Sequence, residues 1–416
     1  MIALIADDLT GASDAGVQFA RRGLATRVLF DISESAATPE VDALVVDTDT
    51  RALPAADAYM RVREVSDRLR TMRPEHVYKK VDSTLRGNLG AEIDAVMDVF
   101  GFTLAVVAPA FPALGRTTRM GIHHLRGRPV HQTEIGRDPK APVRESELVG
   151  LVQGQSRRTA ARIPLETVER GPESIRRQAE ELAGRGVSVL VCDAESDQAL
   201  QAIAESLAER ADVLWVGSAG LAEHLAGPLG LPVRPPRLPR LDALDGPVLV
   251  VAGSLSETTQ AQVSALAARP HIAVVEVDPL AIVGGDAACC AEVERCRHAM
   301  RTALDSGRDC ALVLGTRADR SEAAQRVAEL LGTIAADGAG SHRLGGLILT
   351  GGDTARAVCR EFGATGIELL GEVEAGVPLG RLVGDTCAGV LAVTKAGAFG
   401  SELTLVHALD HLKGDG

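Results

Sequence analysis

Polar residues that suit an anionic, hydroxylated ligand follow three apolar stretches in the first quarter of the sequence. Asp7 and Asp8 come directly after IALIA, Arg51 follows DALVVDTDT, and Lys80 and Asp82 end HVYKKVD. An Arg guanidinium can hold a carboxylate through two parallel hydrogen bonds. A carboxylate can accept hydrogen bonds from hydroxyl groups or remove a proton from one. This set of residues therefore predicts a binding site for a small molecule that carries a carboxylate and hydroxyl groups.

The same residues also have a purely structural interpretation. Asp and Lys at strand ends often lie in solvated loops or pair with one another. Here they occur after three consecutive apolar stretches, together with Lys79, Ser83 and Arg86, and ligands of open α/β sheets bind outside the carboxyl ends of the strands. We therefore favour the ligand-binding interpretation for the group as a whole.

Glycine-rich turns follow apolar stretches in the second half. Gly253 and Ser254 follow VLVVA. The run TGGDT (Thr350 to Thr354) begins at the last residue of LILT, and Gly397 lies in TKAGAFG. Glycines let the backbone approach a phosphate, and the N–H groups at the start of a helix bind anions. The alternative is an ordinary tight turn in which Asp353 or Thr354 caps the helix. No GxxxxGK[ST] motif occurs, and no GxGxxG follows a strand, which weakens a dinucleotide-binding interpretation.

Apolar stretches of about five residues alternate with longer segments of helical period along most of the chain. This alternation predicts an α/β fold of mostly parallel sheets covered by helices. The first unit is predicted as a strand at Ile2–Ala6, a loop DDLTG, and a helix from an N-cap at Ser13 to a stop at Gly23. Between about Gly121 and Arg157 the period is lost, which indicates a hairpin or an excursion from the sheet.

A proline-rich segment divides the sequence into two parts that each show this alternation. Its composition is typical of a semi-rigid linker. We predict domains at residues 1–230 and 247–416, joined by a linker at 231–246. A length of 416 residues also exceeds what one core usually organises.

Composition excludes several classes of protein. The net charge of −12 and the lack of a Lys/Arg block argue against a nucleic-acid partner. Seven cysteines without CxxC or Cys/His spacing predict free thiols in a reducing cytosol. The start, MIALIADDLTG, predicts a strand and not a signal peptide, and no apolar run reaches the 18 residues of a membrane span. We expect a cytoplasmic protein; the sequence leaves a homo-oligomer open.

The combination of motifs is similar to the four-carbon acid sugar kinase family. The segments that carry the resemblance are IADDLTGASDAGVQFARRG, KKVDSTLRGNLGAEIDA, APAFPALGR with EIGRDP, LTGGDTA and TKAGAFG. They occur in order over essentially the whole chain. The resemblance implies an N-terminal domain that binds the acid sugar, a C-terminal domain that binds ATP, and an active site in the cleft between them.

The resemblance also implies roles for individual residues. The implied substrate contacts are Asp8, Arg51, Lys80, Val81 and Asp82. The implied nucleotide contacts are Ser254, Gly351, Gly352, Asp353, Thr354 and Gly397. To these we add Arg86 and Arg116 from their chemistry, and Asp8 as the candidate catalytic base. Mg²⁺ is expected with the ATP, although no ligand for the metal can be named.

The members of this family phosphorylate D-threonate, D-erythronate or 3-oxo-tetronates. The helix that contains AGVQ favours the threonate and erythronate type, with phosphorylation of the C4 hydroxyl; a 3-oxo-tetronate 4-kinase is the alternative. Two other classes stay open: a non-catalytic sugar-acid sensor whose two domains close on a ligand, and a dehydrogenase, which the missing GxGxxG disfavours.

Overall fold

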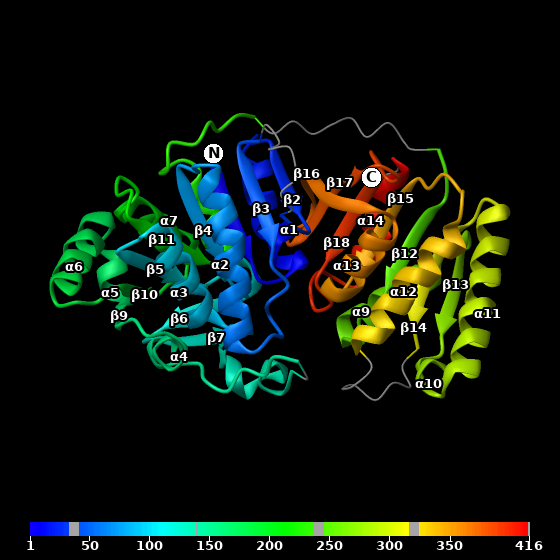
Figure 1. Cartoon of the computed structure of the whole chain (residues 1–416), viewed down its shortest axis with the longest axis horizontal. Coiled ribbons are helices and arrows are strands. Elements are labelled where there is room, and N and C mark those ends of the chain that lie inside the picture. The colour runs from blue at the N-terminus through cyan, green and yellow to red at the C-terminus, as the bar shows by residue number, and fades with distance from the viewer. Residues whose placement is uncertain (33–40, 139, 236–244, 316–323, 415–416) are drawn as a thin grey trace. The chain divides into compact units, whose positions relative to one another are not determined.

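A computed structural model of the chain describes residues 1–32, 41–138, 140–235, 245–315 and 324–414. It contains two compact units, Met1–Pro236 and Arg237–Gly416 (Figure 1). Of the predicted linker, residues 236–244 lie outside the described residues, and residues 231–235 are neither helix nor strand. The boundaries at 230 and 247 therefore stay a prediction.

The large sheet of the first unit contains eight described strands in the spatial order β2-β3-β1-β4-β11-β5-β10-β9, and every described pairing among them is parallel. Their side chains are almost all buried, which explains why they stand out as continuous apolar stretches. The strands are β1 (Ile2–Ala6), β2 (Thr26–Leu29), β3 (Ala43–Asp47), β4 (His76–Lys80), β5 (Leu104–Ala108), β9 (Ala160–Ile163), β10 (Val189–Cys192) and β11 (Val213–Gly217).

Helices cover this sheet in two groups. α1 (Leu9–Ala20), α7 (Asp197–Ser206) and α8 (Ala219–Leu225) pack together, as do α2 (Ala55–Thr71), α3 (Leu89–Phe100) and α4 (Leu148–Gln155). α1 connects β1 to β2, which lies on one side of β1 in the sheet. α2 connects β3 to β4, which lies on the other side of β1. Right-handed crossovers in opposite directions place α1 and α2 on opposite faces. Strand order thus reverses between β1 and β4, where open α/β sheets bind ligands.

The predicted start of the first helix was wrong. α1 begins at Leu9, and its N-cap is Asp8, whose carboxylate accepts the N–H of Gly11, so Ser13 lies inside the helix. The segment LTG was predicted as part of the loop DDLTG. The N-cap bond of Asp8, together with the burial of Leu9 and Ala12, stabilises it as a first helical turn.

A small antiparallel sheet interrupts the alternation in this unit. Its strands are β6 (Arg116–Arg119), β7 (Ile122–Leu125) and β8 (Arg128–Pro129). The excursion predicted from about Gly121 therefore begins earlier, at Arg116. Short 3₁₀ helices lie around it at Pro112–Leu114, Val130–Gln132 and Glu134–Arg137, and α5 (Leu165–Glu169) and α6 (Pro172–Gly184) complete the unit.

The second unit has the strand order β13-β14-β12-β15-β18-β17-β16. The first five are parallel, and β17 and β16 continue the sheet antiparallel. The strands are β12 (Val248–Ala252), β13 (Ile272–Val277), β14 (Asp309–Leu314), β15 (Gly346–Thr350), β16 (Ala364–Glu374), β17 (Val377–Gly384) and β18 (Leu391–Lys395).

The described part of the second unit has six helices: α9 (Glu257–Ala267), α10 (Pro279–Val283), α11 (Asp286–Asp305), α12 (Ala324–Ala339), α13 (Gly352–Glu361) and α14 (Thr404–Lys413). α11, α12 and α13 pack in one group, and α9 packs against α14. The predicted α/β class with mostly parallel sheets is confirmed. Among the described residues, no helix combines the length and apolar character that crossing a membrane requires.

Candidate active site

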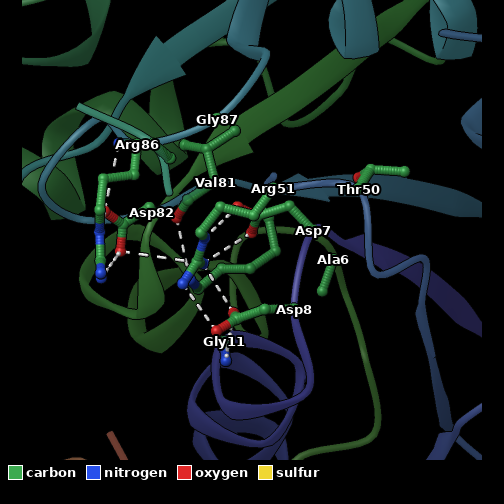
Figure 2. Close-up of polar contacts among 12 residues, drawn as sticks. Ala6, Asp7, Asp8, Gly11, Thr50, Arg51, Val81, Asp82, Arg86 and Gly87 are labelled. Atoms are coloured by element: carbon green, nitrogen blue, oxygen red, sulfur yellow. Dashed lines mark hydrogen bonds and ion pairs between the residues drawn. The ribbon is translucent and has the colours of Figure 1, made fainter. Parts of the chain in front are cut away.

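The centre of the candidate site in the first unit is the guanidinium of Arg51, which two carboxylates hold. Its Nε and Nη2 donate to Asp7 at 2.7 and 3.0 Å, and its Nη1 and Nη2 donate to Asp8 at 2.6 Å each. Figure 2 shows Arg51 reaching across to both Asp side chains, with Asp82 on a third segment beside it. Four of the five N–H groups of Arg51 are therefore used inside the protein.

Sheet register brings these residues together. Ala6 at the end of β1 is opposite Asp47 on β3 and Lys80 on β4, so the three turns that follow begin side by side. The first turn of α1 also has no room for a larger side chain, because a Cβ on Gly11 would lie 2.5 Å from Asp8 Oδ1 and 3.0 Å from Lys80 Nζ. Glycine in the DDLTG motif thus permits the close approach of these charged groups.

Asp82 forms a second charged group with Arg86. Arg86 donates from Nε at 2.9 Å and from Nη2 at 3.2 Å to the Asp82 carboxylate, and from Nη1 at 3.2 Å to Asp138. Asp82 also accepts the hydroxyl of Thr84, and Arg51 Nη2 lies 3.8 Å from Asp82 Oδ1. Asp82 thereby connects the two arginines in one network (Figure 2).

The two adjacent lysines of β4 have different surroundings. The Lys79 ammonium is fully buried, lies 2.6 Å from Glu92 of α3, and donates to two backbone carbonyls. The Lys80 ammonium lies beside Gly11 and donates to Val81 O at 2.9 Å, and it forms no ion pair with any described residue. The alternation of side chains along a strand explains the difference. Lys80 therefore lies in the candidate site, whereas Lys79 stabilises the packing of α3.

The network pushes the pKa values of neighbouring carboxyl groups apart. Burial raises the pKa of Asp8. The negative charges of Asp7 and Asp82 raise it further, and the positive charge of Arg51 only partly offsets these effects. Burial also acts on Asp7 and Asp82, but Arg51 and the lysines hold the pKa of Asp7 below its usual value, and Arg86 with Arg51 holds that of Asp82 well below it. Separated pKa values are characteristic of catalytic acid and base pairs. Asp8 is thus the carboxyl best suited to accept a proton.

His123 also lies in this region, where its position in the sequence did not place it. It is fully buried in β7 and contacts Thr118 Oγ1 at 2.9 Å through Nδ1 and the backbone oxygen of Ser83 at 2.9 Å through Nε2. Burial lowers its pKa to about 4. A neutral ring that donates from Nε2 thus fixes the loop that carries Asp82. Arg116, predicted from its chemistry, is buried nearby, and burial lowers its pKa while Asp82 opposes this effect.

Three turns of the second unit converge at the ends of β12, β15 and β18. Ala252 is opposite Thr350, which is opposite Lys395. A Cβ on Gly397 would collide with the side chain of Ser254, and one on Gly351 would lie 3.7 Å from both Ser254 and Thr354. The structure therefore brings the predicted nucleotide contacts into one cluster. Their role stays a prediction.

The two helices that leave this cluster begin differently. Ser256 caps α9 by accepting the N–H of Thr259. The hydroxyls of Ser256 and Thr259 both donate to Gly397 O, at 2.7 and 2.9 Å. α13 begins after Gly351, which has a φ of +96° and gives no side-chain cap. The alternative of Asp353 or Thr354 as N-cap was therefore wrong, and the first N–H groups of α13 are a suitable anion site.

Comparison with known proteins assigns the two units to families. Residues 2–225 match the family described as the sugar-binding N-terminal domain, and residues 249–405 match the nucleotide-binding C-terminal domain. A D-threonate kinase of Salmonella typhimurium is 36% identical, with 99% of this chain and 98% of the relative covered. A D-threonate kinase of Bordetella bronchiseptica is 39% identical, with 99% and 97% covered.

More distant relatives extend the range of named activities. A D-erythronate kinase of Heliobacterium modesticaldum is 32% identical, with 99% of this chain and 97% of the relative covered. A 3-oxo-tetronate kinase of Methylobacterium radiotolerans is also 32% identical, with 98% of each covered.

A solved structure agrees with the fold. The crystal structure of a Salmonella typhimurium LT2 protein, described as a tRNA synthase, superposes with a TM-score of 0.81 at 26% identity over 99% of each chain. The curated relatives are more similar in sequence than this protein, so they carry the functional argument. With both domain families matched and relatives aligned along its whole length, the chain belongs to the four-carbon acid sugar kinase family.

Proposed function

We propose that the protein transfers the γ-phosphoryl group of ATP to the C4 hydroxyl of a four-carbon sugar acid, and that this acid is D-threonate. The observation that carries the proposal is the full-length similarity to D-threonate kinases, which exceeds the similarity to the D-erythronate and 3-oxo-tetronate kinases. In this proposal the first unit binds the acid and the second binds the nucleotide.

The ion-pair network suggests how the acid binds. Asp7 and Asp8 occupy four N–H groups of Arg51, so we assign to Arg51 mainly the task of holding these carboxylates in position. Lys80 uses one of its three donors on Val81 O and is the better candidate for the substrate carboxylate. Arg86, whose side chain is 25% exposed, offers a second cation at the same loop.

Asp8 is the proposed base for the C4 hydroxyl. Its Oδ1 accepts from Gly11 and from Arg51, whereas its Oδ2 accepts only from Arg51 among the described residues. Oδ2 therefore retains capacity for one substrate hydroxyl. Its raised pKa, caused first by burial, makes it a stronger proton acceptor than Asp7.

The carboxylates also favour a polyhydroxy acid over a 3-oxo acid. Asp7 and Asp82 have pKa values below the usual range and are ionised at neutral pH, so they accept hydrogen bonds and donate none. A C3 hydroxyl can donate to such a group, but a C3 carbonyl cannot. This favours D-threonate or its C2 epimer D-erythronate over a 3-oxo-tetronate.

Mg²⁺ is proposed to bind together with the nucleotide phosphates. The described residues contain no group of three or more His, Cys, Asp or Glu side chains arranged to hold a metal ion. Mg²⁺ in kinases commonly takes most of its ligands from phosphate oxygens and water. It would neutralise charge on the transferred group, and the protein would supply positioning.

An ADP-release assay with Mg-ATP tests the proposal. The panel contains D- and L-threonate, D- and L-erythronate and the 3-oxo-tetronates, with the product mass measured for each. The expected result is turnover on D-threonate at the highest kcat/KM, with a monophosphate as product. Turnover only on a 3-oxo-tetronate would overturn the substrate assignment. Binding of an acid without any ADP release would instead favour a sensor.

A further inference from the structure

A buried lysine of the second unit lies among the three converging turns, and neither the family resemblance nor the proposed reaction assigns it a role. Lys395, the last residue of β18, has no exposed surface. Its ammonium donates to Gly397 O at 3.3 Å, and it forms no ion pair with any described carboxylate. The acidic residues Glu257, Asp353 and Glu402 lie on the surrounding segments, and burial is the cause that lowers the pKa of Lys395.

A buried ammonium without a counter-ion is unfavourable unless another group compensates for the lost hydration. Elsewhere in the described chain the buried lysine Lys79 has such a partner, Glu92, at 2.6 Å. One carbonyl at 3.3 Å leaves two N–H donors of Lys395 without a partner in the protein. The described residues therefore provide no negative charge beside Lys395, and an anionic ligand can supply one.

A second buried polar group lies next to Lys395. Thr350 is opposite Lys395 in the parallel register of β15 and β18, so both side chains point to the same face of the sheet. The Thr350 hydroxyl is fully buried and has no hydrogen-bond partner among the described residues. Two adjacent buried side chains with unused hydrogen-bonding capacity indicate a site built for a polar ligand.

The position of these groups identifies the kind of ligand. The carbonyl of Lys395 accepts the N–H of Gly351 at 3.0 Å, and Gly351 is the uncapped start of α13. The cation and the start of α13, which has no side-chain cap, therefore lie on neighbouring residues, and both are suited to an anion. A nucleotide phosphate matches this chemistry, and the missing side chain at Gly351, where a Cβ would meet no atom closer than 3.7 Å, allows it to approach the backbone.

We propose that Lys395 binds a phosphate of the nucleotide and that Thr350 completes its hydrogen bonding. This inference rests on the proposed kinase function and adds to it a residue that neutralises phosphate charge. Burial lowers the pKa of Lys395 to about 7, so above neutral pH much of it is uncharged without nucleotide. A bound phosphate would stabilise the charged form. Nucleotide binding at pH 8 should then take up a proton from the solvent.

Calorimetric titration of the full-length protein with Mg-ADP at pH 8, in two buffers of different ionisation enthalpy, measures this proton. We expect uptake of about one proton per nucleotide for the wild type. Lys395→Met should weaken Mg-ADP binding by at least ~30-fold and abolish the proton uptake, and its thermal midpoint without nucleotide should be no lower than that of the wild type. The control is Lys413→Met, because the Lys413 ammonium is paired with Asp309 at 2.7 Å and should not affect either signal.

The outcomes separate this inference from the proposed function. If Lys395→Met binds Mg-ADP with wild-type affinity, or still takes up the proton, Lys395 does not bind phosphate, although the kinase proposal stands. If the wild type does not bind Mg-ADP at all, both proposals fail. Lys395→Arg gives a further check, because a permanently charged side chain should bind without proton uptake.

Discussion

Lys79 and Glu92 form an ion pair of 2.6 Å between β4 and α3, and both side chains are buried. Removing one partner leaves the other charge buried and uncompensated, so Lys79→Met should lower the free energy of unfolding by about 3–5 kcal/mol. Lys79→Met combined with Glu92→Met should recover most of this loss, since two apolar side chains replace the pair. Urea denaturation of the three proteins measures the effect. A double variant less stable than the single one would show that the pair is not the cause.

Asp8→Asn tests the proposed base. Asn is also a good N-cap, so α1 should form normally. The amide cannot accept a proton, and we expect kcat to fall by roughly 10²–10⁴-fold with little change in KM for the acid. Steady-state kinetics measures both constants, with Asp7→Asn as the matched control that should affect kcat less. Near wild-type kcat with a raised KM would leave Asp8 only a binding role.

His123 should make the first unit sensitive to acid. Its pKa in the folded protein, about 4, is lower than the 6.5 of an unperturbed histidine, so the unfolded chain binds more protons between these pH values. The free energy of unfolding should therefore be unaffected by His123 above pH 6.5 and fall by about 3 kcal/mol as the pH drops to 4.

Denaturation curves at pH 7 and pH 4.5 for the wild type and for His123→Asn measure this contribution. The variant should show a smaller loss of stability between the two pH values. Because the ring also holds the Ser83 carbonyl, the variant should raise KM for the acid even at pH 7. Equal losses in the two proteins would assign the acid sensitivity to the carboxyl groups instead.

Gly397→Ala should impair the nucleotide site selectively. The new Cβ would collide with Ser254, so one of the two turns must move. We expect KM for ATP to rise by at least ~10-fold, a change equivalent to about 1.4 kcal/mol of binding free energy, while KM for the acid stays unchanged. Gly154→Ala is the control, because no atom lies within 4 Å of its added Cβ. An equal rise in both KM values would indicate general destabilisation.

The sequence predicted the elements with strong local signals. The buried parallel strands, such as β1 and β12, stand out as apolar stretches bounded by polar or glycine-rich turns, and the residues in those turns converge as expected. Asp8 as the N-cap of α1 was missed because LTGA has weak helical propensity, and tertiary packing overrides it.

The ion pairs depend on three-dimensional register and could not be derived from spacing. Arg51 is suitable for a substrate carboxylate on chemical grounds, and only the alignment of β1 and β3 places Asp7 and Asp8 within reach of it. The alternation of side chains along β4 distinguishes Lys80 from Lys79, and only Lys80 was predicted as a substrate contact. Lys395 lies in the TKAGAFG motif, which was interpreted through Gly397 alone, because a lysine at a strand end is usually solvated.

The strand order of the first unit has a consequence for biosynthesis. β11 pairs with both β4 and β5, although four helices and two strands of the large sheet come between β5 and β11 in the chain. Translation must therefore reach Gly217 before the middle of this sheet can close, and pairings so distant in sequence form slowly. Trp215, the single tryptophan of the chain, lies in β11 and is buried there. Its fluorescence is thus a built-in reporter of the moment when the central strand enters the sheet.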